Sequence, residues 1–151
     1  MRAVIRTSLA HADLRLKQFS IYPVMIAKYF LLWLPMVGLA FVNAAMRQLM
    51  LMQHFNELRA HQLSTVTLIV FCAIYHMLIF PFLHLESGNQ ALLVGLLWTV
   101  LTVLFEFSLG RLLKHSWTEL FQQYNFTTGY IWPCFLLFLL LFPFLLYFFK
   151  R

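Results

Sequence analysis

One acidic side chain lies inside an apolar run of this sequence and is the first candidate for chemistry. Glu106 follows Phe105 close to the end of the run from residue 91 to residue 109. A carboxylate surrounded by apolar groups can bind and release a proton or attract a cation. Because Glu106 lies about one helical turn from the end of the run, its position favours a salt bridge or a lipid-headgroup contact over a transport site at the membrane centre.

Small and polar residues recur at helical spacing in three of the apolar runs. In membrane helices such residues usually mark the faces where helices touch, because lipid offers them no partner. The stripes are Gly95, Thr99, Thr102 and Glu106; Ala40, Asn43 and Arg47; and His61, Thr65, Cys72 and His76. If the runs cross a membrane in alternation, their polar ends share one side. This predicts packing faces that end in a polar cluster, with an ion pair between Glu106 and arginine. The candidate members of the cluster are Asn43, Arg47, His61, Glu106 and Arg111.

The histidines and cysteines do not form a cofactor pattern. A membrane haem of the b type needs two axial histidines from facing helices, and His76 is the sole histidine in the middle of an apolar run. Zinc-type spacings, nucleophile motifs and Gly-rich phosphate loops do not occur in the sequence. Cys72 and Cys134 are expected to be apolar fillers, with a redox pair as the alternative. The sequence therefore predicts no cofactor, no metal and no catalytic residue.

The elements that must position these residues are four apolar runs. With 62% hydrophobic and 11% charged residues, the chain is too apolar to cover its surface with polar groups in water. Runs of about 17 to 25 residues can cross a bilayer as helices. We predict an all-α fold, an integral membrane four-helix bundle that forms one domain over residues 1–151. The expected spans cover residues 23–46, 63–83, 91–109 and 130–149, with residues 47–62 as a helical connection along the interface.

Two further helices are expected at the membrane surface. Residues 1–20 combine basic residues with apolar residues at helical spacing, which predicts a cationic amphipathic helix; a mitochondrial presequence is the alternative. Ser116 and Glu119 match a capping box, which predicts a short helix over residues 117–125. One face of that helix is aromatic, so it should lie flat at the interface. The expected interfacial anchors are Trp117, Tyr124 and Trp132.

The charge distribution bears on orientation and partners. The net charge is +6, but the basic residues flank the apolar runs instead of forming a soluble face, which argues against a nucleic-acid partner. Four spans place both termini on one side, where seven basic residues stand against four on the other side. This excess favours cytoplasmic termini. Basic residues at the span ends are expected to contact membrane lipids.

The last third of the chain carries a resemblance. Its residues are Phe105-Glu106-Phe107, Gly110, Ser116-Trp117, Leu120, Tyr124-Asn125, Gly129 and Trp132. With these residues and its layout of runs, the chain resembles uncharacterised four-span bacterial inner-membrane proteins of about this length. The resemblance implies a location in the bacterial inner (plasma) membrane and implies no activity.

The polar cluster leads to three hypotheses for function. The first is a non-enzymatic membrane component, either an accessory subunit of a larger complex or a small lipid- or solute-handling protein. The second is a proton-coupled transporter, working as a homo-oligomer, in which Glu106 couples proton and substrate movement. The third is a lipid-modifying membrane enzyme with Glu106 and His61 as acid and base, which requires both residues to reach one water-accessible cavity.

Overall fold

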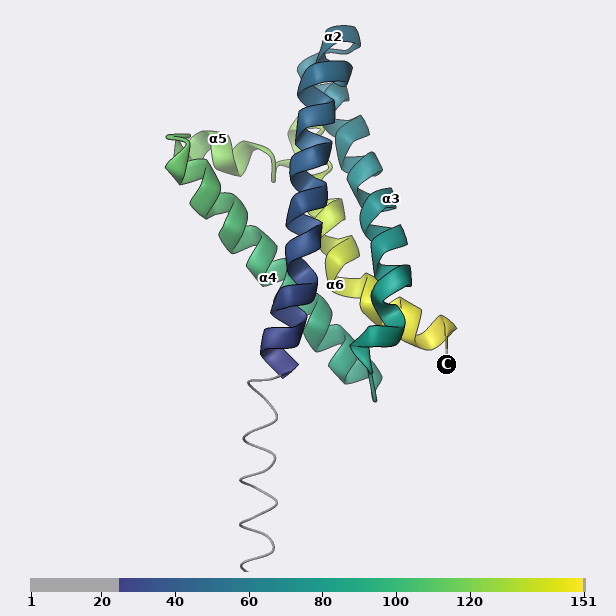
Figure 1. The fold of residues 1–151 in the computed structure, drawn as a ribbon. Coiled ribbons are helices and arrows are strands. Elements are labelled where there is room, and N and C mark those ends of the chain that lie inside the picture. Colours follow the sequence, from purple (N-terminus) through teal and green to yellow (C-terminus); the bar gives the residue numbers. More distant parts are fainter. Residues whose placement is uncertain (1–24, 151) are drawn as a thin grey trace, which may run out of the picture. The chain divides into compact units, whose positions relative to one another are not determined.

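The computed structural model describes residues 25–150, and every regular element in this range is a helix. Four helices are long and apolar enough to cross a membrane (Figure 1). They are the first spanning helix (Met25–His54), α3 (Glu57–Leu83), α4 (Gly88–Leu112) and α6 (Trp132–Phe149). The predicted all-α membrane fold is thereby confirmed, and the chain is a multi-pass membrane protein. The surface helix predicted for residues 1–20 lies outside the described residues.

The chain divides into two units, Met1–Leu32 and Trp33–Arg151. In the first unit, residues 25–32 are helical and belong to the first spanning helix. The second unit holds the remainder of that helix, residues 33–54, together with all later elements. Every residue predicted for the polar cluster lies in this second unit.

The turn between the first two spans is much shorter than predicted. The first spanning helix continues past residue 46 through a π-helical stretch (η1, Arg47–Leu51) and a last turn (α2, Met52–His54). Asn56 then caps α3, its side chain accepting a backbone N–H at 2.9 Å. The expected interfacial connection over residues 47–62 is therefore the joined ends of two spans. Polar residues are tolerated there because the ends of membrane helices reach the headgroup region.

The most extensive helix packing joins α4 and α6. A Cβ atom at Gly95 would lie 2.1 Å from the Leu140 carbonyl oxygen and 3.0 Å from that of Leu139. Only glycine therefore lets the two backbones meet at this point. Trp98, one turn further along α4, is fully buried. Close backbone approach at small residues is typical of membrane helix contacts, so the packing role predicted for this stripe is confirmed at Gly95.

A proline and a lysine connect α3 with α6 at the opposite end from the polar cluster. Pro81 lies inside α3 and has no N–H to donate to the carbonyl of Met77, four residues earlier. Lys150 donates to that carbonyl oxygen from Nζ at 3.3 Å, and its ammonium lies 5.2 Å from the centroid of the Phe80 ring. The end of α6 is thus bonded to α3 at the carbonyl that Pro81 leaves without its helical partner.

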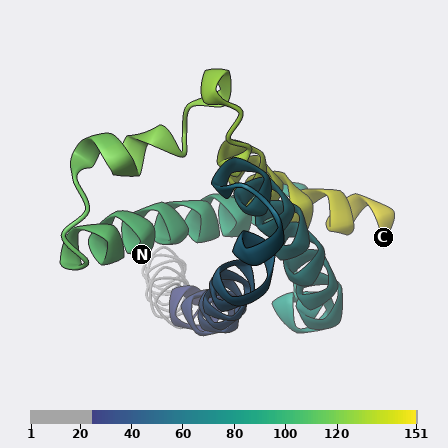
Figure 2. The same ribbon diagram turned by 90° about the horizontal axis from the view of Figure 1, so that it is seen from above.

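Between α4 and α6 the chain leaves the packed helices and returns through α5 (Trp117–Gln122) and a 3-10 turn, η2 (Phe126–Thr128), as Figure 2 shows. The predicted capping box is present: the Ser116 N–H donates to Glu119 Oε2 at 2.7 Å, and the Glu119 N–H donates to Ser116 Oγ at 3.3 Å. Hydrogen bonds from Ser116, its backbone N–H first, hold the pKa of Glu119 below its usual value.

The helix at residue 117 ends earlier than predicted. α5 stops at Gln122 instead of residue 125, because Asn125 acts as the cap of η2. The Asn125 side chain accepts hydrogen bonds from the Thr127 N–H at 3.0 Å and the Thr127 hydroxyl at 2.6 Å. Gly129 then turns the chain with φ 89°, a conformation that favours glycine. This early end turns the residues after α5 back towards the spanning helices.

Candidate functional site

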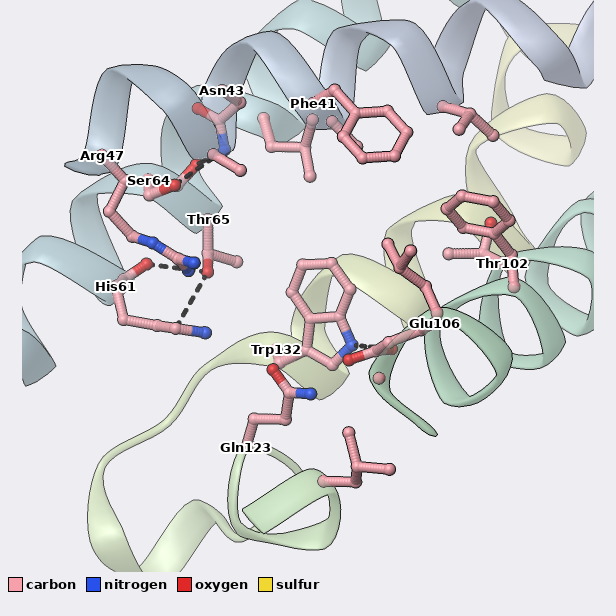
Figure 3. Close-up of a pocket in the computed structure, with 18 of the residues that line it drawn as sticks. Phe41, Asn43, Arg47, His61, Ser64, Thr65, Thr102, Glu106, Gln123 and Trp132 are labelled. Carbon is pink, nitrogen blue, oxygen red and sulfur yellow. Dashed lines mark hydrogen bonds between the residues drawn. The ribbon is translucent and has the colours of Figure 1, made fainter. Parts of the chain in front are cut away.

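A cavity of about 300 Å³ lies among the ends of the spans in the second unit. It is placed where the first spanning helix approaches its end, α3 begins, α4 approaches its end and α6 begins, so the alternation of the spans brings these parts together as predicted. α5 and the residues after it contribute the remaining wall (Figure 3). The polar lining consists of Asn43, Arg47, His61, Ser64, Thr65, Thr102, Glu106, His115, Gln123 and Trp132.

Glu106 is held by neutral hydrogen-bond donors. Tyr124 donates its hydroxyl to Glu106 Oε2 at 2.7 Å, and Trp132 donates its indole N–H to the same oxygen at 2.8 Å. The Gln123 carboxamide also faces the cavity near this carboxylate (Figure 3). Within residues 25–150, no lysine or arginine nitrogen lies within 4 Å of this carboxylate. The expected ion pair with arginine is replaced by these donors because the turn after α5 brings them to α4.

Tyr124 is affected by the same contact. Its ring is half-buried, and burial together with the adjacent Glu106 carboxylate raises the pKa of its hydroxyl above the usual value. The hydroxyl therefore remains protonated and can act as a stable donor to Glu106. Tyr124 and Trp132 were predicted as interfacial anchors, and the structure shows that both also bind the carboxylate.

Arg47 lies on the other side of the cavity from Glu106 (Figure 3). Its side chain is half-buried, and Glu57 and Tyr130 are close enough to influence it electrostatically. Among the described residues, no carboxylate oxygen lies within 4 Å of the guanidinium, and no hydrogen bond from it is formed. Arg47 and Glu106 thus present opposite charges to one cavity without neutralising each other.

Gln123 lies between the two charged regions. Its carboxamide faces the cavity between Glu106 and His61. In Figure 3 its oxygen points towards His61 and its nitrogen towards Glu106. The His61 ring also stands edge-on to Tyr130, with centroids 4.9 Å apart. Gln123 therefore lies between His61 on α3 and Glu106 on α4, and all three residues line the same cavity.

Asn43 has a structural partner on α3. Its amide N–H groups donate to the Ser64 carbonyl oxygen at 2.9 Å and to Ser64 Oγ at 2.7 Å. Asn43 and Ser64 are both buried. Below the cavity, the Trp33 indole N–H donates to Thr102 Oγ1 at 3.0 Å and joins the first spanning helix to α4. These bonds fix the helices that form the cavity walls.

Arg111 does not join the polar cluster. Its guanidinium donates to the His115 carbonyl oxygen at 2.8 Å and lies 4.9 Å from the centroid of the Trp117 ring. The side chain is exposed, and it does not line the cavity. Helical spacing explains this placement, because Arg111 lies five residues after Glu106 and so points to a different face of α4.

The short helix α5 docks on α4 through aromatic rings and one glycine. Trp117, Phe121 and Tyr124 surround Phe107, with ring centroids 6.1, 5.3 and 5.6 Å from its own. A Cβ atom at Gly110 would lie 2.3 Å from Leu120 Cδ2, so glycine makes room for the buried Leu120 side chain. This docking holds Gln123 and Tyr124 at the cavity.

A second cavity of about 370 Å³ adjoins the first. It lies between the end of the first spanning helix, the start of α3 and α5, and Glu57 and Glu119 line its outer part. The residues that line both cavities are Arg47, His61, His115, Leu120 and Gln123. The charged groups can therefore be approached from the α5 side as well as from between the helices.

The polar groups outside this site are not arranged for metal binding. Residues 25–150 contain no group of three His, Cys, Asp or Glu side chains that could hold a metal ion. His76 is fully buried on α3, where its Nδ1 is 2.6 Å from the Cys72 carbonyl oxygen and acts as the donor. Its Nε2 has no hydrogen-bond partner in the described part of the chain. Cys72 is buried and Cys134 exposed, and both are free thiols.

Sequence reasoning missed one member of the site. Gln123 is absent from the predicted polar cluster, yet it lines the cavity between Glu106 and His61. The signal that could have found it is its place just after the capped helix, beside Tyr124, in a turn that must return to the spans. Comparison with protein families, with curated proteins and with solved structures finds no match to this chain.

Proposed function

We propose that this protein is a non-enzymatic membrane component that binds the polar part of a membrane lipid or solute in the cavity between Arg47 and Glu106. Of the two forms of the leading hypothesis, lipid or solute handling and an accessory subunit, the cavity favours the first. The resemblance supports a location in the bacterial inner membrane. The excess of basic residues on the side of the termini supports cytoplasmic termini.

The observation that carries this proposal is a cavity whose two charges have not neutralised each other. Ion pairs that serve structure alone are formed directly, because an uncompensated charge in a low-dielectric setting costs free energy. Here Arg47 has no carboxylate within 4 Å in residues 25–150, and Glu106 is held by neutral donors. A cavity of this volume is at the lower end of about 300–1,000 Å³, the usual size of small-molecule sites.

The test is to fill the cavity and to ask whether a bound molecule leaves. Ala44 lines the cavity, whereas its neighbour Ala45 is exposed on the outer face of the same helix. The protein is purified in mild detergent, and its retained lipids and solutes are identified by mass spectrometry. Ala44→Leu should remove a specific bound molecule, whereas Ala45→Leu should retain it. A molecule that is retained equally by both variants, or no specific molecule at all, would contradict the proposal.

A proton-coupled transporter is the second candidate, and one observation favours it. Glu106 and His61 line the same cavity with Gln123 between them, so two titratable groups face one space. In this reading Glu106→Gln abolishes the pH dependence of ligand binding or transport in proteoliposomes, while the protein still folds and inserts. Unchanged pH dependence in this variant would exclude Glu106 as the coupling group.

A further inference from the structure

The chemistry of the cavity identifies the class of ligand more closely than its volume does. The inference that follows rests on the proposed function, because it requires that the cavity bind a ligand. Arg47 offers five N–H donors in a planar fork that suits a phosphate. Glu106 offers a carboxylate that can accept about four hydrogen bonds, and Tyr124 and Trp132, which both donate to Oε2, leave part of this capacity open.

Charge complementarity decides between ligands of different charge. An anionic ligand would compensate Arg47 and leave Glu106 without a cation, while a cationic ligand would do the reverse. A ligand that carries both a phosphate and a primary ammonium compensates both residues at once. Arg47 and Glu106 line the same cavity and form no ion pair with each other, so both remain available to such a ligand.

The apolar walls of the cavity indicate where the remainder of the ligand lies. Val37, Phe41, Phe105 and Leu109 line the cavity between the first spanning helix and α4. Phe41 and Leu113 line it while being 52% and 62% exposed, so the cavity opens sideways to the apolar surface of the spans. A polar solute would gain nothing from this opening, whereas an acyl chain can occupy it without leaving an apolar environment.

We propose that the cavity binds a zwitterionic phospholipid of the phosphatidylethanolamine type, with its phosphate at Arg47, its ammonium at Glu106 and an acyl chain leaving past Phe41. The chemistry that is recognised is a phosphate and a primary ammonium on one molecule. A free molecule such as phosphoethanolamine shares this chemistry, but it lacks the acyl chain that the apolar opening accepts.

The experiment measures lipid binding to the delipidated full chain by native mass spectrometry. Phosphatidylethanolamine, phosphatidylcholine and phosphatidylglycerol compete in equal amounts, and phosphoethanolamine is tested separately. Phosphatidylethanolamine should bind best, since the choline group cannot donate N–H bonds and the glycerol headgroup carries no cation. Arg47→Gln and Glu106→Gln should each weaken its binding about tenfold or more, the usual effect of removing one charged hydrogen-bond partner.

Matched controls separate these effects from changes in overall charge or folding. Arg59→Gln removes an exposed cation from the first turn of α3, and Glu86→Gln removes an exposed acid at the opposite end of the spans. Both should leave phosphatidylethanolamine binding unchanged. Arg47→Lys is a second variant at the site, which keeps the charge and should lose less binding than Arg47→Gln if the contact is to a phosphate.

The outcomes distinguish this inference from the proposed function. Preference for phosphatidylglycerol, or stronger binding after Glu106→Gln, would overturn the assignment of a zwitterionic ligand and indicate an anionic one. If phosphoethanolamine binds as tightly as the lipid, the inference that the phosphate and ammonium belong to a lipid would be overturned. In these cases the proposed function stands if Ala44→Leu removes the ligand that binds. If no ligand binds, both the inference and the proposed function fail.

Discussion

The cavity around Glu106 and the core around His76 handle buried polarity in opposite ways. Glu106 lies near the end of α4, accepts hydrogen bonds from Tyr124 and Trp132, and borders open space. His76, on α3, lies against the middle of α4 and α6, makes one short bond to its own helix, and is otherwise surrounded by aromatic rings. The ring centroids of Trp98 and Phe142 lie 4.9 and 5.6 Å from that of His76.

The difference shows that position along a span decides what a polar side chain can do. Near the ends of the spans, segments outside the membrane helices can return and supply donors, as the residues after α5 do for Glu106. In the middle of the spans only neighbouring helices are available, and here they supply aromatic rings. The cavity can therefore carry charges and exchange a ligand, whereas the core holds one isolated polar group in a packed apolar setting.

The largest expected effect comes from breaking the core. Gly95→Leu places a side chain against the Leu139 and Leu140 carbonyl oxygens, which are backbone atoms and cannot move aside. Separation of α4 from α6 should lower the free energy of unfolding by about 3 kcal/mol or more. The measurement is unfolding by sodium dodecyl sulfate in mixed micelles. Gly38→Leu is the matched control, because a Cβ at Gly38 meets nothing within 4 Å; equal losses in both would contradict the assigned contact.

A smaller effect is expected at the cavity. Tyr124→Phe and Trp132→Phe each remove one donor to Glu106 Oε2, and each should cost about 1.5–3 kcal/mol because the acceptor is a carboxylate. The two losses should be non-additive, since the donors share one oxygen. The same unfolding assay measures them. Tyr147→Phe serves as control, because its exposed hydroxyl donates to the backbone carbonyl of Glu86. A similar loss of unfolding free energy in this variant would contradict the larger effect expected for donors to the Glu106 carboxylate.

Removing the N-cap of α5 should lower the free energy of unfolding by about 1 kcal/mol. Ser116→Ala removes the side-chain cap of α5, an effect of about 0.5–2 kcal/mol for an N-cap. The readout is the fluorescence of Trp117 together with binding of the cavity ligand. Thr118→Ala, an exposed neighbour within α5, should leave both unchanged. Weaker ligand binding in Ser116→Ala alone would show that α5 holds the cavity wall in place.

The capping box at Ser116 also predicts that the stability of α5 depends on pH. The pKa of Glu119 is lower in the folded state than in the unfolded state. The stability that its hydrogen bonds contribute to the fold is therefore present above the unfolded value of about 4.3. It is lost as the pH falls through the folded value. Trp117 fluorescence should therefore change below about pH 4. Glu119→Gln should lack this transition. A transition of equal size in that variant would assign it to another group.

The smallest effect is expected at His76. His76→Leu removes one hydrogen bond to a helix carbonyl and also removes a buried nitrogen that has no partner among the described residues. These terms oppose each other, so the free energy of unfolding should change by less than about 1 kcal/mol. His61→Leu, in contrast, should weaken ligand binding by replacing a polar group of the cavity lining with an apolar one. A large loss of stability in His76→Leu would mean that the core histidine has an essential role.

Much of the fold follows from the sequence, because lipid imposes strict requirements on length and apolarity. The four spans, the capping box at Ser116 and the close contact at Gly95 were all predicted from local pattern. The predicted ends of the first two spans are wrong, because the change to polar residues at Arg47 does not end the helix, which continues to His54. Local pattern shows where polarity begins and does not show where helical hydrogen bonding stops.

The candidate site was predicted only in part, for a physical reason. Alternation of the spans brought Asn43, Arg47, His61 and Glu106 to one side, and they do line one cavity. The partners of Glu106 depend on how the chain after α5 turns back, and this is set by the cap at Asn125 and the left-handed Gly129. Sequence spacing could not show that Glu106 would accept hydrogen bonds from Tyr124 and Trp132 instead of pairing with an arginine.

The spanning helices also differ in length, and this has a consequence for the bilayer. α3 has 27 residues and α6 has 18, so at about 1.5 Å per residue they extend over about 40 Å and 27 Å. A hydrocarbon layer of about 30 Å fits α6 closely and is exceeded by α3. The bilayer beside α6 should therefore be locally thinner, or α3 should be tilted. Where the bilayer is thinner, a lipid beside Trp132 stands nearer the membrane centre than its neighbours and has a shorter path into the protein.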